Sequence, residues 1–377
     1  MTSKERLLKV LRGEIPDHVP VAPDTSNMIP AKLTGKPFWD IYLYQHIPLW
    51  KAYINCVKHF GFDSLMDGYA QILFDELGEI DHEWKEVIVF RSEDRIVTQK
   101  YRTANGIKEW TKTVTVYYRS NPPTWSVNPH LIKLPSVPDK YEEIVDIQKW
   151  PTGEKLLKLV KEEMGDRGLV GVFCGTTLLL GNVEDIYDYY DNPDKYHKKR
   201  DVMIEQYKKR FDKLMSLEHK PDFICTGGSG TLIFQTPDIF RELALPIVKE
   251  ITKLCKNHGI PSHVHSCGPE KELVKIMVEE TDLTIIDPLE VAPMGNCNLK
   301  ELKSLYGSRI VLKGNLHTTN IMLKGTVKQV IEASKKAIDD AAEGGGFILS
   351  TGDQCGRDTP EENIYAMIET AKTYGKY

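Results

Sequence analysis

The sequence lacks the features that mark several large classes of protein. Its longest apolar stretches, such as residues 168–175, fall far short of the roughly 18 residues that a membrane span needs. Lys and Arg (49) nearly balance Asp and Glu (54), and no block of like charges occurs, so the basic footprint of a nucleic-acid-binding protein is missing. A hydrophobic content of 41% excludes a disordered or collagen-like chain. We therefore expect a globular protein that binds neither nucleic acid nor a membrane.

A signal peptide and a disulfide framework are also missing. The N-terminal segment MTSKERLLKVLRGE is typical of a charged amphipathic helix without the apolar centre of a signal peptide, so we expect a cytoplasmic protein. Seven cysteines in 377 residues do not make a disulfide framework in such a chain. Four of them lie in apolar patterns that predict buried thiols, namely Cys56, Cys174, Cys225 and Cys255. Cys297 has no evident partner in the sequence, and Cys267 and Cys355 are considered below.

Eight short apolar runs, each of the length of a buried parallel strand, are separated by helical patterns. The runs are residues 18–24, 62–68, 168–174, 222–226, 261–267, 283–289, 309–315 and 346–351. Among the helical patterns, residues 326–342 begin with a capping box formed by Thr326 and Gln329. The alternation predicts an α/β protein, a (β/α)8 TIM barrel that spans residues 1–377 as a single domain. A doubly wound open sheet is the alternative.

Residues 81–135 interrupt this alternation. The segments VIVF, RIVTQKYR and EWTKTVTVYYR alternate apolar with polar residues, and Asn105-Gly106 is typical of a hairpin turn. The pattern predicts an antiparallel β-insertion between the second and third barrel strands.

Metal-binding side chains cluster at two predicted strand ends, which is where catalytic groups lie in a barrel. The fifth strand ends in PSHVHSCG, in which the alternate residues His263, His265 and Cys267 share one side. His265 and Cys267 together suit zinc, although a buried histidine beside a core cysteine is the commoner meaning of so short a pattern. The eighth strand ends in FILSTGDQCGRDTP and places Cys355 across the barrel mouth. Three protein ligands and one open position are typical of catalytic zinc.

Other polar residues at predicted strand ends are candidates for substrate binding, each with a helix cap or a loop ion pair as the alternative. They are Asp24, Asp67, Asp287, Glu290 and Asp353, together with His317, for which a solvated loop position is the alternative. Met66 and Tyr69 are candidates for an apolar pocket, with core packing as the alternative. The sequence contains no glycine-rich phosphate loop of the GxGxxG or GxxxxGK type.

Several segments resemble the uroporphyrinogen decarboxylase superfamily, and the resemblance runs through essentially the whole chain, least clearly in the β-insertion. The segments are KERLLKVLRGEIPDHVPV, HSCG, GNLH followed by LKGTVKQV, and GGGFILSTGDQCGRDTPEENI. The His-x-Cys and Cys-Gly-x-x-Thr-Pro patterns resemble the zinc-dependent methyltransferases that work with methylated corrinoid proteins. This resemblance implies a (β/α)8 barrel, zinc ligands at His265, Cys267 and Cys355, and a corrinoid (cobalamin) cofactor.

The sequence departs from both branches of this superfamily. No arginine occurs between Arg12 and Arg91, whereas a decarboxylase needs guanidinium groups there to hold a substrate rich in carboxylates. Many methyltransferases of the family carry an acidic residue where GNLH has His317, and TGGSG, after the fourth strand, lacks another one. The sequence therefore leaves the fourth zinc contact and the substrate pocket undefined.

We therefore expect a zinc-dependent methyltransferase that moves a methyl group between a small molecule and a corrinoid. Two directions fit: a thiol takes the methyl group, or a methyl ether such as a methoxylated aromatic gives it up in an O-demethylation. Uroporphyrinogen decarboxylase activity and a non-catalytic corrinoid-binding or metal-binding role are the alternatives. The chain lacks the Asp-x-His-x-x-Gly motif of corrinoid carriers, so we expect the cofactor on a separate corrinoid-binding protein that docks transiently.

Overall fold

A computed structural model of the protein describes residues 1–67, 83–228 and 231–377. The chain forms two compact units. The larger unit comprises Met1–Thr25, Val57–Ala70 and Leu157–Tyr377, and the smaller unit comprises Ser26–Cys56 and Gln71–Leu156. Nowhere in the described ranges is there a helix with the length and apolar character of a membrane span.

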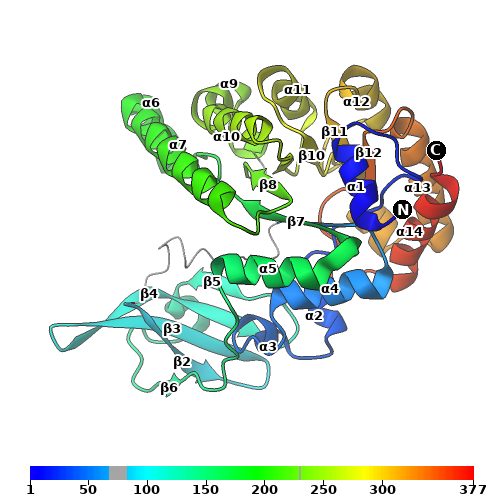
Figure 1. Ribbon diagram of the computed structural model, residues 1–377. Coiled ribbons are helices and arrows are strands. Elements are labelled where there is room, and N and C mark those ends of the chain that lie inside the picture. Colours follow the sequence, from blue (N-terminus) through cyan, green and yellow to red (C-terminus); the bar gives the residue numbers. More distant parts are fainter. Residues whose placement is uncertain (68–82, 229–230) are drawn as a thin grey trace. The chain divides into compact units, whose positions relative to one another are not determined.

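The larger unit is built on one parallel sheet, which curls in space as Figure 1 shows. Its seven strands are β1 (Ser64–Met66), β7 (Gly168–Phe173), β8 (Phe223–Thr226), β9 (Ser262–His265), β10 (Ile285–Asp287), β11 (Val311–Leu316) and β12 (Phe347–Thr351). They lie in the sheet in the order in which they occur in the chain. This sequential order is that of a TIM-like barrel, and it excludes the doubly wound alternative, in which the strand order reverses at a switch point. The α/β class and seven of the predicted strands are confirmed.

The first predicted strand, residues 18–24, forms only two isolated bridges, an antiparallel one between His18 and Lys376 and a parallel one between Val21 and Leu349 of β12. Prolines at positions 20 and 23 carry no N–H group and interrupt the ladder of hydrogen bonds that a strand requires. The Val21 N–H group donates to the carboxylate of Asp63 (2.9 Å), and its carbonyl accepts from the Asp63 N–H group (2.8 Å). The prediction of a full strand here is wrong, because the two prolines prevent the regular hydrogen bonding that the apolar pattern suggests.

Helices of the larger unit return the chain between the strands, and α10 to α14 lie around the outer side of the sheet in Figure 1. The helices are α1 (Ser3–Leu11), α6 (Val183–Asp191), α7 (Pro193–Ser216), α8 (Thr231–Phe234), α9 (Pro237–Ile239), α10 (Leu245–Asn257), α11 (Lys271–Glu280), α12 (Leu299–Tyr306), α13 (Val327–Ala341) and α14 (Glu361–Tyr374), with the short turns η3 (Gly165–Arg167), η4 (Phe240–Ala244) and η5 (Thr318–Leu323). The predicted capping box of Thr326 and Gln329 is present at the start of α13.

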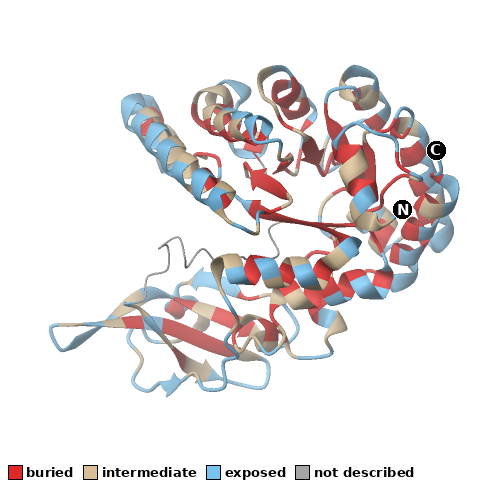
Figure 2. Cartoon of the chain, in the orientation of Figure 1, coloured by how far each residue is buried: buried red, intermediate tan, exposed pale blue. Residues whose placement is uncertain are grey.

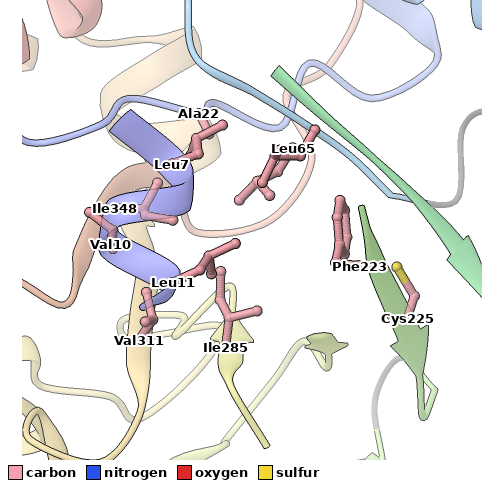
Figure 3. Packing of buried hydrophobic residues seen from close by; sticks show 11 residues of the cluster. Leu7, Val10, Leu11, Ala22, Leu65, Phe223, Cys225, Ile285, Val311 and Ile348 are labelled. Carbon is pink, nitrogen blue, oxygen red and sulfur yellow. The ribbon is translucent and has the colours of Figure 1, made fainter. Parts of the chain in front are cut away.

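The core of the larger unit begins at the amino ends of the strands. Side chains of α1 pack there on the first residues of several strands, and Figure 3 shows Leu11 beside Ile285 and Val311, and Val10 beside Ile348. Figure 2 shows the strands of the sheet as almost continuously buried. The four cysteines predicted to be core thiols are buried, and Cys297 is buried as well.

The smaller unit contains an antiparallel sheet with the strand order β5-β4-β3-β2-β6. The strands are β2 (Lys85–Arg91), β3 (Arg95–Ala104), β4 (Ile107–Tyr118), β5 (Thr124–Val127) and β6 (Glu142–Glu143), and the unit also holds α2 (Met28–Leu33), α3 (Phe38–Tyr42) and η2 (Pro129–Ile132). The predicted hairpin turn is present, since Asn105 and Gly106 join β3 to β4 with φ of 52° and 79°. Helices α4 (Leu49–Phe60) and α5 (Gly153–Met164) contribute residues to both units.

Candidate active site at the carboxyl ends of the strands

His265, the last residue of β9, is held by a carboxylate on the neighbouring strand. Its Nδ1 atom lies 2.9 Å from Oδ1 of Asp287 in β10. A carboxylate only accepts hydrogen bonds, so Nδ1 carries the proton and, in the neutral ring, Nε2 offers its lone pair. Nε2 lies 3.6 Å from Oδ1 of Asp353. Burial opposes the charged imidazolium, but the carboxylates of Asp287 and Asp24 outweigh burial and raise the pKa of His265 well above its ordinary value.

Cys267 is placed by a tight turn at Gly268. Gly268 has a φ of 106°, which side chains disfavour, and a Cβ atom there would lie 2.6 Å from Cδ1 of Ile233. The Gly268 N–H group donates to Oε2 of Glu290 at 2.6 Å. The turn brings the Cys267 sulfur and one carboxylate oxygen each of Glu290 and Asp353 within 4.8 Å of one another. The HSCG motif therefore needs its glycine to present the cysteine beside two carboxylates.

Asp353 connects Cys267 with His265. Its carboxylate also lies near a ring nitrogen of His265 and the carboxylate of Asp24, and these three ligand atoms lie within 4.8 Å of one another. Asp353 has a φ of 93°, which is uncommon for a residue with a side chain and occurs preferentially at functional sites. The loop after β12 therefore places a carboxylate close to His265 and Cys267, two of the three residues predicted to bind zinc.

Cys355 follows in the same loop and is fully buried. Its N–H group donates to the carbonyl of Asp24 at 2.9 Å. Burial raises the pKa of the Cys355 thiol to about 12. Among the described residues, its sulfur belongs to none of the three groups whose ligand atoms lie within 4.8 Å of one another.

A second, buried polar cluster lies around His263, two residues before His265 in β9. It contains His263, whose Nε2 atom is 3.2 Å from Oδ1 of Asp287 and whose Nδ1 atom is 3.7 Å from Oδ2 of Asp67. The ammonium group of Lys313 in β11 donates to the other oxygen of Asp287. Burial opposes ionisation of Asp287, but the charges of Lys313 and of the two histidines hold the pKa of its carboxyl well below its ordinary value.

The remaining predicted site residues lie outside these groups. His317 caps η5, and its Nδ1 atom accepts from the N–H groups of Thr319 (3.1 Å) and Asn320 (3.2 Å). Met66 is fully buried, as expected for the core alternative, and Tyr69 lies outside the described residues. The sequence analysis missed Lys313, for which the only signal was a lysine inside the otherwise apolar run VLKGNL.

The side chains at the carboxyl ends of the strands are suited to bind a divalent metal and to take part in acid–base chemistry. Imidazole nitrogen and thiolate sulfur are the donors that zinc prefers, and carboxylate oxygens complete many such sites. Burial raises the pKa of the Asp67, Glu290 and Asp353 carboxyl groups above ordinary values. Raised carboxyl pKa values of this kind are typical of groups that exchange protons near neutral pH.

Comparisons with known proteins identify a family and several relatives. Residues 126–374 match the family described as uroporphyrinogen decarboxylase (URO-D). A protein named methylcobamide:CoM methyltransferase MtbA, from Methanosarcina acetivorans, is 30% identical over 137 residues, and its namesake from Methanosarcina mazei is 28% identical over 139 residues. Each match covers 36% of this chain and 37% of the relative, so little more than a third of each relative's length is matched.

A solved structure shares the fold over the whole length. It is titled "methyltransferase from Methanosarcina mazei" and aligns with a TM-score of 0.60 and 18% sequence identity over 99% of both chains. At this identity the likeness establishes the fold alone.

Proposed function

The chain belongs to the uroporphyrinogen decarboxylase family, and within this family we propose that it is a zinc-dependent methyltransferase. It would move a methyl group between a small molecule and a corrinoid cofactor carried by a partner protein. The observation that carries the proposal is the pairing of His265 with Cys267 at the carboxyl end of β9, where Asp287 already holds the far nitrogen of the histidine ring. The names of the matched relatives support the same chemistry.

The residues present fit a zinc ion. A carboxylate on Nδ1 is the usual partner of a histidine that binds zinc through Nε2, and Asp287 supplies it. We propose His265, Cys267 and Cys355 as the ligands, with Asp353 or Glu290 as the carboxylate nearest to the remaining position. Zinc bound there would act as a Lewis acid, either toward a thiol acceptor or toward the oxygen of a methyl ether.

The chain's own residues would bind and orient the small molecule. Asp24, Asp67 and Glu290 are the predicted substrate contacts that lie close to His263, His265 or Cys267. Asp287 would act through His265, and His317 would contact only a substrate that reaches η5. Ile233 packs against Gly268, the residue that follows Cys267. The two directions of transfer, to a thiol or from a methyl ether, both remain within the proposal.

Decarboxylation of uroporphyrinogen is the alternative that the family name favours. Its substrate is rich in carboxylates and would meet further carboxylates here, since Asp67 and Asp353 are partly exposed at the carboxyl ends of β1 and β12. In the same part of the larger unit, the Lys313 ammonium is already paired with Asp287, and Arg357 is paired with Asp358. Such a lining disfavours binding of a polyanion.

A reconstituted assay tests the proposal. Purified protein is mixed with free methylcobalamin and a small thiol, or with reduced cobalamin and a methoxylated aromatic, and the cobalamin spectrum is followed. We expect methyl transfer in one of the two mixtures, none without corrinoid, and no tightly bound corrinoid in the purified protein. Turnover without corrinoid would contradict the proposal, and so would conversion of uroporphyrinogen to coproporphyrinogen at an ordinary enzymatic rate.

A further inference from the structure

A buried lysine, Lys313, is paired with Asp287 of the candidate active site. Lys313 is in the middle of β11, and only 6% of its surface is exposed. A buried ammonium group is costly unless a carboxylate pairs with it, and here the partner is Asp287, which is 1% exposed. Burial would lower the pKa of Lys313, but the carboxylates of Asp287, Asp67 and Asp24 raise it to about 12.

The strand register places this pair beside the metal-binding histidine. His265 in β9 and Asp287 in β10 are register partners. Ile286 pairs with Leu312, so one residue further along the strands Lys313 stands next to Asp287. Register partners on neighbouring parallel strands project to the same side of the sheet, so His265, Asp287 and Lys313 form one row across three strands.

Asp287 is held from both sides within this row. One carboxylate oxygen faces Nδ1 of His265 at 2.9 Å, and the other oxygen accepts from the ammonium group of Lys313. Without the lysine, Oδ2 of Asp287 would lose the donor that fixes the orientation of the carboxylate, and Oδ1 could turn away from Nδ1 of His265. The imidazole ring of His265 would then lose the partner that orients it.

We infer that Lys313 is a positioning residue, which acts through Asp287 to hold His265 with Nε2 free for the metal. The inference rests on the proposed function, because it assigns the lysine a role in metal binding. A purely structural alternative is that the ion pair only stabilises the sheet. The two differ in a measurable way, because a structural pair would affect unfolding and leave the metal site as it is.

The test compares metal binding in Lys313→Met and Asp287→Asn with that in the wild-type protein. Lys313→Met keeps the length of the side chain and removes its charge, and Asp287→Asn breaks the same row at nearly constant volume. Metal-free protein is titrated with Co2+, whose visible spectrum reports the ligand geometry, and Zn2+ affinity is measured against a chelator. We expect both variants to bind Zn2+ about 10–100-fold more weakly, as is usual when the partner of a metal-binding histidine is lost, and to show an altered Co2+ spectrum.

The matched control is Arg6→Met, which removes the cation of another buried ion pair, formed with Asp63. It should lower the unfolding temperature and leave the Zn2+ affinity and the Co2+ spectrum unchanged. If Lys313→Met fails to fold, Lys313→Gln, which also removes the charge, takes its place, because Asp287→Asn by itself tests only the contact between Asp287 and His265. Wild-type affinity and spectrum in the folded variants would overturn the role of Lys313 only. A wild-type protein that binds neither metal would overturn the proposed function as well.

Discussion

The two ends of the parallel sheet in the larger unit are built from the same strands but carry opposite kinds of side chain. At the amino end, Leu7 and Val10 of α1 pack on apolar residues, and the buried Arg6 has its charge matched by Asp63. At the carboxyl end, the same strands present His265 and Lys313 together with several carboxylates. This division follows the TIM-barrel rule that one end supplies stability and the other supplies chemistry.

The size of a cavity does not identify the functional end. A hollow of about 820 Å³ opens at the amino end, where Leu8, Leu11 and Ile310 are among the lining residues. None of the residues predicted to bind zinc or substrate lines it. The carboxyl end is recognised instead by convergent polar groups with shifted pKa values, which are costly to bury and contribute little to stability.

The largest expected difference between the two ends is the loss of zinc from variants of the carboxyl end. His265→Ala and Cys267→Ala should each reduce zinc from about one ion per chain to almost none, because a site with three protein ligands retains metal poorly after losing one. Elemental analysis of purified protein measures this. Cys255→Ala, in the buried face of α10, is the control and should retain its zinc.

A pair of variants decides the third ligand. Cys355→Ala should lose zinc and Asp353→Asn should retain most of it, as the proposed ligand set requires. The opposite result, with zinc retained in Cys355→Ala and lost in Asp353→Asn, would assign the third position to Asp353, whose carboxylate already lies near both His265 and Cys267.

Substitutions at the amino end of the sheet should change the stability of the protein and leave its metal content unchanged. Arg6→Met leaves the buried carboxylate of Asp63 without its cation, and removal of one partner from a buried ion pair typically costs about 3–5 kcal/mol. Urea unfolding of the zinc-loaded protein measures this loss, and its zinc content should equal that of the wild type. A decrease in zinc in the folded Arg6→Met protein would show that the two ends are not independent.

The sequence predicted the strands and the ends at which chemistry-bearing residues lie, because both follow from local patterns. Buried parallel strands are short apolar runs, and His265 and Cys267 lie where such a run meets its loop. The segment 18–24 has the apolar pattern of a strand but forms only isolated bridges, because Pro20 and Pro23 carry no N–H group for a ladder of hydrogen bonds.

The contacts across the site could not be predicted from the sequence. The row of His265, Asp287 and Lys313 depends on the register of three strands that are about twenty residues apart in the chain, and nothing local fixes that register. The position of Asp353 between His265 and Cys267 depends in the same way on how the loop after β12 folds, with a φ of 93° at Asp353 itself.

Replacing one glycine at each end of the sheet by alanine should give a smaller difference in stability and zinc binding. Gly268→Ala, at the carboxyl end, combines an unfavourable φ with a contact of 2.6 Å to Ile233, and we expect a loss of about 1–3 kcal/mol in unfolding free energy together with weaker zinc binding. Gly13→Ala, at the end of α1, has a φ of 75° and open space around the added methyl group. It should cost about 1 kcal/mol and leave zinc binding unchanged, as chemical unfolding and chelator competition would show. Equal zinc affinity in both variants would mean that the HSCG turn does not position Cys267.

The smallest expected effect is a pH-dependent one at the amino end. The hydrogen bonds from Arg6 to Asp17, at 2.7 and 2.9 Å, hold the pKa of the Asp17 carboxyl well below its ordinary value. Asp17 therefore contributes stability that is present above the pKa of an unfolded aspartate, about 3.9, and is lost as the pH falls toward the lower value in the folded protein. Because the Asp17 side chain is 38% exposed and screened by water, Asp17→Asn should cost only about 1 kcal/mol or less at pH 7. Thermal unfolding of both proteins from pH 7 to pH 3 should show the difference narrowing below about pH 4. A difference that stays constant over this range would mean that Asp17 contributes through packing and not through its charge.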